Sequence, residues 1–231
     1  MGVRKSATSW IWKQFTDHPD VYTLPEKEVY FFNKNYKKGL NWYRSKFTTN
    51  QGVVLDTTPD YFFKGACDRI KNDLPDAKLL VCLRNPIDRA YSHWKFGCFV
   101  GNCSEEFIDA WNKDWNRVRT RGLYDNHLGC YLQHYRLGDS FLALLYDDLQ
   151  ADPLMFVNKI QDYLEVPRRL SGFFDKKWMP GEVSETNTEK DYEAISKRRM
   201  SRSDCITLKA YYNNSIINTE NILGRDLGHW K

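Results

Sequence analysis

The stretch Lys78-Leu79-Leu80-Val81-Cys82-Leu83, followed at once by Arg84-Asn85-Pro86, decides the fold. Its first part is continuously apolar, as a strand is when helices cover both faces of a parallel sheet. Pro86 suits the first turn of a helix, and the pattern predicts a helix that runs through Trp94. A buried strand that passes directly into a helix is typical of α/β proteins.

Apolar runs and helical spacings alternate along the rest of the chain. The sequence predicts further strands or strand-like segments at residues 27–32, 53–55 and 141–146. It predicts helices after Trp10, at 61–74, from Ser104, at 124–135, after Asp152-Pro153 and at 203–217, with polar loops at 33–41 and 171–203. This order predicts the α/β class with a mainly parallel sheet, in which ligands bind at the carboxyl ends of strands.

Length and charge narrow the classes of protein. The 231 residues suit a single domain over 1–231, and a net charge of +4 is compatible with an anionic ligand but too small to indicate nucleic acid. No apolar run approaches the ~20 residues needed to span a bilayer, so we expect no membrane contact by this segment, although a longer form could be anchored. The six cysteines form no CxxC pair, which argues against a zinc site.

The stretch Gly2-Val3-Arg4-Lys5-Ser6-Ala7-Thr8-Ser9-Trp10 predicts an anion site. Small residues open onto an apolar, aromatic helix, so backbone N–H groups, the hydroxyls of Ser6, Thr8 and Ser9 and the charge of Lys5 would face a phosphate-like group. The Walker A spacing is absent, and an ordinary capped helix is the alternative. Such a loop normally follows a buried strand, so we expect the sequence to be cut before or within its first strand.

A second phosphate motif begins at Arg84. Arg84 leaves the end of a strand, and Ser92 lies two turns into the following helix. Both side chains can reach one phosphate, the arginine through a bidentate fork and the serine through its hydroxyl.

The two motifs together resemble the nucleotide-binding motifs of sulfotransferases that use 3′-phosphoadenosine 5′-phosphosulfate (PAPS). The resemblance is strongest to the heparan sulfate (glycosaminoglycan) sulfotransferase branch. The stretches that carry it are Gly2-Val3-Arg4-Lys5, His18-Pro19-Asp20-Val21, Glu28-Val29-Tyr30-Phe31-Phe32, Thr58-Pro59, Leu123-Tyr124 and Asp152-Pro153. The resemblance implies a P-loop-like, three-layer α/β/α fold, a glycan or small alcohol or amine as acceptor, and no metal ion. It leaves two alternatives for the location of the protein, the Golgi lumen and the cytoplasm.

The resemblance also implies a role for each matching residue. Glu28 would be the general base, and Lys5 would bind the transferring sulfuryl group and stabilise the leaving phosphate oxygen. The loop residues Ser6, Ala7, Thr8 and Ser9 would hold the 5′-phosphate. Arg84 and Ser92 would hold the 3′-phosphate, and Lys197 and Arg198, in a basic C-terminal loop, would close over the nucleotide.

Three positions depart from the pattern of the branch. Ser6-Ala7 replaces a glycine pair. Thr57 stands where the branch often has a lysine that would assist at the sulfuryl group, and Tyr30 stands where a histidine often follows the base.

Other interpretations stay open. Glu28 could instead only pair with a nearby lysine such as Lys27, and Cys98 could bond to Cys103 in an oxidising compartment. The rival functions are a P-loop kinase or nucleotide hydrolase, and a non-catalytic module that binds nucleotide or glycan.

Overall fold

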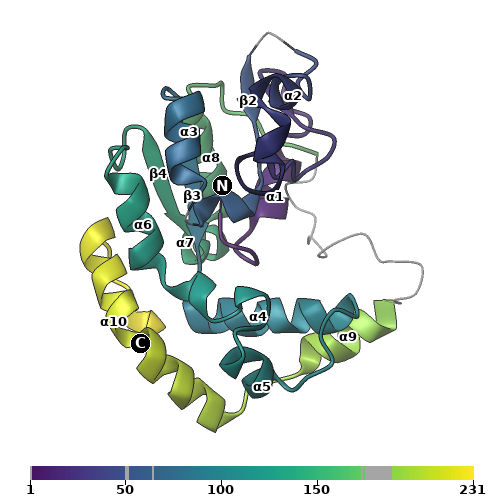
Figure 1. Cartoon of the computed structure of the whole chain (residues 1–231), viewed down its shortest axis with the longest axis vertical. Coiled ribbons are helices and arrows are strands. Elements are labelled where there is room, and N and C mark those ends of the chain that lie inside the picture. The colour runs from purple at the N-terminus through teal and green to yellow at the C-terminus, as the bar shows by residue number, and fades with distance from the viewer. Residues whose placement is uncertain (1, 50–51, 64, 173, 175–188) are drawn as a thin grey trace. The chain divides into compact units, whose positions relative to one another are not determined.

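The computed structural model describes residues 2–49, 52–63, 65–172, 174 and 189–231. The chain forms two compact units, Met1–Arg84 with Cys130–Trp178 and Asn85–Gly129 with Met179–Lys231 (Figure 1). A single domain over 1–231 remains a prediction. The first unit contains the strands, and the second is helical in the residues that the structure describes.

The strands of the first unit run parallel. β3 (Leu79–Leu83) pairs with β4 (Phe141–Leu145), with Leu79 opposite Phe141, and β1 (Val21–Thr23) pairs with β2 (Val53–Leu55), with Val21 opposite Val53. All five residues of β3 are buried. The strands predicted at 78–83, 53–55 and 141–146 are confirmed, and every pairing among the described strands is parallel, as expected.

Helices cover both faces of β3 and β4. On one face, alternate strand residues such as Leu80 and Leu142 join a buried cluster with side chains of α1 (Thr8–Phe15), α7 (Tyr146–Ala151) and α8 (Pro153–Leu164). On the other face, Phe141 lies 5.6 Å, between ring centroids, from Tyr131 near the end of α6 (Tyr124–Leu132). Tyr131 in turn stacks on Phe62 of η3 (Pro59–Phe62). Layers of helices on both faces of a parallel sheet confirm the α/β/α class.

Helix starts follow from local sequence. Asp152 precedes Pro153 and its side chain accepts a hydrogen bond from Met155 N at 2.9 Å, which caps α8. In the second unit, Asn85 caps α4 (Pro86–Phe99) in the same way through Ile87 N at 3.0 Å. Both prolines occupy the first helical position, as predicted.

The second unit packs helices on one another. α4 lies against α5 (Phe107–Asn112), α9 (Glu189–Lys197) and α10 (Arg202–Leu223). Trp94 contacts Phe107, and Tyr212 donates a hydrogen bond to Arg119 O at 2.7 Å. Arg89 is fully buried and donates to Val118 O.

The strand predicted at 27–32 is wrong. Residues 27–30 have no regular secondary structure, and Phe31–Asn35 forms a short π-helix, η1. Tyr30 has a φ of 53°, which breaks an extended backbone. The amides that a strand would offer to a neighbouring strand donate instead to side chains, Val29 N to Thr58 Oγ1 at 3.0 Å and Phe31 N to Tyr61 Oη at 2.7 Å.

Other predicted boundaries need correction. The helix predicted at 61–74 is interrupted, because η3 ends at Phe62 and α3 is Cys67–Asp73. The predicted loop at 33–41 contains η1, η2 (Tyr36–Lys38) and the start of α2 (Leu40–Arg44). The predicted loop at 171–203 includes α9, most of the rest of it lies outside the described residues, and α10 runs to Leu223.

Candidate active site

The loop before α1 has an unusual backbone. Lys5 and Ala7 both have left-handed conformations, with φ of 72° and 64°. Ser6 N donates to Val3 O at 3.1 Å, so the chain turns tightly before the helix begins. A Cβ on Gly2 would come within 2.6 Å of Thr8 Cγ2, which leaves no room for a larger residue there. No strand precedes this loop in the described residues, and Val3 is nevertheless fully buried.

Polar groups of this loop suit an anionic guest. Ser6 is fully buried, and its Oγ has no hydrogen-bond partner among the described residues. A buried hydroxyl without a partner is uncommon, because it carries the cost of lost hydration. The first-turn N–H groups of α1 lack partners within the helix, as at any helix N-terminus. The residues present therefore fit a phosphate-like group.

Arg84 brings the second motif to the loop. It directly follows β3, and its Nη1 donates to Lys5 O at 3.3 Å, although 79 residues separate the two in sequence. Its guanidinium lies 4.8 Å from the centroid of the Tyr146 ring. The carboxyl end of β3 and the loop therefore meet, as the rule for parallel sheets predicts.

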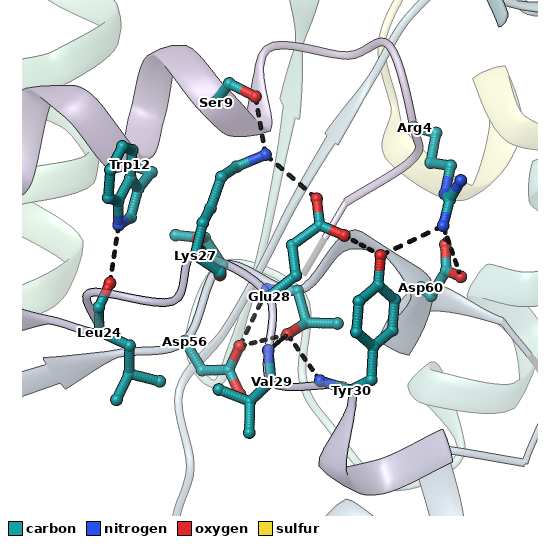
Figure 2. Close-up of polar contacts among 12 residues, drawn as sticks. Arg4, Ser9, Trp12, Leu24, Lys27, Glu28, Val29, Tyr30, Asp56 and Asp60 are labelled. Carbon is teal, nitrogen blue, oxygen red and sulfur yellow. Dashed lines mark hydrogen bonds and ion pairs between the residues drawn. The ribbon is translucent and has the colours of Figure 1, made fainter. Parts of the chain in front are cut away.

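Glu28 has a partner on each carboxylate oxygen (Figure 2). Lys27 Nζ lies 3.1 Å from Oε1, and the hydroxyl of Tyr30 donates to Oε2. Lys27 Nζ also donates to Ser9 Oγ at 2.7 Å. Glu28 therefore has polar partners as well as the apolar residues that follow it in sequence, and the structure contains its ion pair with Lys27.

A chain of polar contacts continues behind Tyr30. Arg4 Nη2 donates to the hydroxyl of Tyr30 at 3.2 Å, and Arg4 Nε donates to Asp60 Oδ1 at 3.1 Å (Figure 2). Burial and the neighbouring Glu28 carboxylate raise the pKa of Tyr30 well above its usual value. Tyr30 therefore stays a neutral phenol that donates a hydrogen bond to the carboxylate.

The turn after β2 supports the backbone of the same segment. Asp56 Oδ1 accepts hydrogen bonds from Thr58 N at 2.9 Å and Thr58 Oγ1 at 2.7 Å, and Tyr43 and Tyr61 both donate to Oδ2 at 3.0 Å. Burial, followed by the charge of Asp56, raises the pKa of both tyrosines. Thr57 Oγ1 donates to Lys27 O at 3.0 Å. Turn and segment are thus fixed to each other by side chains.

The remaining predicted nucleotide residues belong to the second unit. Ser92 is half-buried on α4. Lys197 ends α9 and pairs with Glu193 at 2.6 Å, and Arg198 lies 5.7 Å from the centroid of a Trp94 ring. Lys197 is therefore helical and not in a loop. The roles of all three on a nucleotide remain predictions.

The thiols do not decide the location of the protein. All six cysteines are free in the structure, Cys98 and Cys103 among them. Burial raises the pKa of Cys98 to about 11.

One group of residues of metal-ligating types within the described residues has its ligand atoms within 4.8 Å of one another. It consists of Cys67, Asp68 and Cys130. The prediction that no metal is required stays untested.

A family model described as the sulfotransferase domain matches residues 1–215. The chain belongs to the sulfotransferase domain family. Within the described residues, no helix of this sulfotransferase domain combines the length and the apolar composition of a membrane span.

Curated relatives point in the same direction. The sulfotransferase domain is 33% identical over 179 residues to heparan sulfate glucosamine 3-O-sulfotransferase 6 of Homo sapiens, covering 73% of this chain and 52% of that protein. It is 32% identical over 183 residues to heparan sulfate glucosamine 3-O-sulfotransferase 3B1 of Mus musculus. This match covers 73% of this chain and 45% of that protein. The chain therefore spans about half the length of these relatives.

Solved structures confirm the fold. A sulfotransferase from Alicyclobacillus acidocaldarius superposes with a TM-score of 0.80 at 23% identity, over 100% of this chain and 96% of that one. The mouse sulfotransferase SULT7A1, solved in complex with PAP, superposes with a TM-score of 0.60 at 13% identity. The superposition covers 95% of this chain and 83% of that one.

Sequence reasoning missed part of the polar network of this sulfotransferase domain. It named Lys27 only as a possible partner of Glu28, and it gave no role to Arg4 or Asp60. Lys27 and Ser9 are 18 residues apart and Arg4 and Asp60 are 56 apart, so no local pattern joins them. The available signal was Thr57, which stands where the resembling branch often has a lysine.

Proposed function

We propose that this sulfotransferase domain transfers the sulfuryl group of PAPS to a hydroxyl or amine of a heparan-sulfate-like glycan. The observation that carries the proposal is the contact between Arg84 Nη1 and Lys5 O, which joins the loop before α1 to the first residue of the second motif. The names of the curated relatives support a glycan acceptor, and the family supports PAPS as the donor.

In the proposed reaction the acceptor oxygen or nitrogen attacks the sulfur atom, and Glu28 takes its proton. The bond between sulfur and the 5′-phosphate oxygen of PAPS breaks in line with the attack. The products are the sulfated acceptor and adenosine 3′,5′-bisphosphate (PAP). Lys5 and the first turn of α1 stabilise charge on the leaving phosphate, as in phosphoryl transfer.

The nucleotide supplies the first test. PAP should raise the melting temperature by mass action, and AMP, which lacks the 3′-phosphate, should bind more weakly. Equal affinity of the two in calorimetry would contradict the assignment of Arg84 and Ser92.

Labelled sulfate transfer from PAPS to a panel of glycans and small alcohols tests the reaction itself. We expect transfer to a glycan by the wild-type chain and nearly none by E28Q. Binding of PAP without transfer to any acceptor would favour the non-catalytic module instead. Thr57 is the observation that favours this second candidate, because its hydroxyl is used on Lys27 O and offers no charge. Magnesium-dependent ATP turnover would favour a kinase or hydrolase.

A further inference from the structure

The side chain of Lys27 links the two halves of the proposed reaction site. Its ammonium donates to Ser9 Oγ at 2.7 Å, in the first turn of α1, and to Glu28 Oε1 at 3.1 Å (Figure 2). The side chain is 23% exposed, and that of Glu28 is 24% exposed. Charges that are mostly out of water interact more strongly than a surface pair does.

From this geometry we propose that Lys27 is the positioning residue of the transfer site. The inference rests on the proposed function, because it assigns Glu28 as the base and the first turn of α1 as the donor site. Lys27 holds the carboxylate of Glu28 beside Ser9, oriented to accept the proton of the acceptor.

The contact with Ser9 gives Lys27 a second effect. Because Ser9 Oγ accepts from the ammonium, its own O–H remains to donate to a phosphate or sulfuryl oxygen. Hydrogen bonds in such a chain polarise one another, so the charge of Lys27 strengthens the donor that a bound anion meets. Thr57 contributes by fixing the carbonyl of Lys27 at 3.0 Å.

The other charged groups around Glu28 do not replace this role. Tyr30 is neutral and donates a hydrogen bond. Arg4 is paired with Asp60 at 3.1 Å and donates to Tyr30, and its charge interacts with that of Glu28 without a hydrogen bond between them. Among the described residues that form a hydrogen bond or an ion pair with Glu28, Lys27 alone carries a positive charge. Its removal should therefore leave the carboxylate held by Tyr30 alone.

Kinetics of K27M, K27R and K78M test the role, with labelled PAPS and the best acceptor of the wild type. Lys78 is the matched control: it also pairs with a glutamate, Glu165, but precedes β3 at the end opposite Arg84. We expect the kcat of K27M to fall about 10²-fold, as for a misplaced reacting group. We expect PAP affinity to fall by no more than about threefold, through the weaker donor at Ser9, and we expect K27R to recover most of the rate.

The outcomes separate the two proposals. An inactive wild type would refute the proposed function. An active wild type whose K27M variant has the kcat of K78M would refute the role of Lys27 alone. Thermal shift with PAP verifies the fold of each variant, and K27Q takes the place of K27M if the methionine variant does not fold.

Discussion

The loop at Gly2–Ala7 and the segment at Lys27–Tyr30 contribute to the same proposed reaction, but they differ in how far their polar groups are already satisfied. In the loop, the buried Ser6 Oγ has no partner among the described residues. In the segment, both carboxylate oxygens of Glu28 are engaged, and the backbone is held by Thr57 and Thr58.

The difference indicates which part awaits a ligand and which part is prepared in advance. A buried hydroxyl without a partner is costly unless a guest completes it. A carboxylate that is already oriented loses less entropy when the acceptor arrives. Substitutions in the segment should therefore affect turnover or stability, whereas substitutions around the loop should affect nucleotide affinity.

The largest expected effect is that of Glu28→Gln. Glutamine keeps the size of Glu28 and one acceptor oxygen but cannot take a proton, so kcat should fall roughly 10²–10⁴-fold. PAP affinity measured by calorimetry should barely change, because the proposed phosphate contacts lie elsewhere. Near-normal turnover of the variant on a confirmed acceptor would mean that Glu28 is not the base.

Arg84→Ala should act on the nucleotide instead. It would remove the proposed charged contact with the 3′-phosphate, worth about 1.5–3 kcal/mol, which corresponds to a loss in PAP affinity of roughly ten- to hundredfold. Affinity for AMP should fall much less, since AMP lacks the 3′-phosphate. An unchanged dissociation constant for PAP would make Arg84 a bystander.

Local patterns predicted the parts of the fold that depend on burial and capping. The structure contains three features that local patterns predicted: the apolar run of β3, the proline in the first turn of α4 and the helix that follows Asp152-Pro153. The segment after Lys27 was not predictable in this way. Its shape depends on Thr58 and Tyr61, side chains about 30 residues away that accept the amide hydrogens of Val29 and Phe31.

The candidate site also has parts that local sequence predicts and parts that depend on distant contacts. Lys5, Glu28 and Arg84 were identified because their residue types and order resemble a family, and the contact between Arg84 and Lys5 follows from strand topology. The resemblance carries residue types only, whereas the bridge from Lys27 to Ser9 depends on how two loops approach each other. The contacts of a position that departs from the family pattern, such as Thr57, can therefore be read only from a structure.

Thr58→Ala should lower stability without touching the chemistry directly. Thr58 is fully buried, and its hydroxyl donates to Asp56 and accepts from Val29 N. Its loss leaves buried polar groups unpaired, so the free energy of unfolding should fall by about 1–3 kcal/mol. Urea denaturation measures this change. Thr58→Ser keeps the hydroxyl and serves as the control, with most of the stability retained.

Ser6→Ala should have the smallest effect and tests the comparison most directly. Since Ser6 Oγ has no partner among the described residues, removing it takes away an unsatisfied buried group. The free energy of unfolding without ligand should stay the same or rise by up to about 1 kcal/mol. When PAP is present, the variant should lack the proposed hydrogen bond from Ser6 to the nucleotide. The affinity for PAP should therefore fall about fivefold, for the loss of roughly 1 kcal/mol. The same denaturation experiment, run with and without PAP, gives both quantities. A loss of stability without ligand as large as that of Thr58→Ala would show that the loop is as fully satisfied as the segment, and the distinction between them would fail.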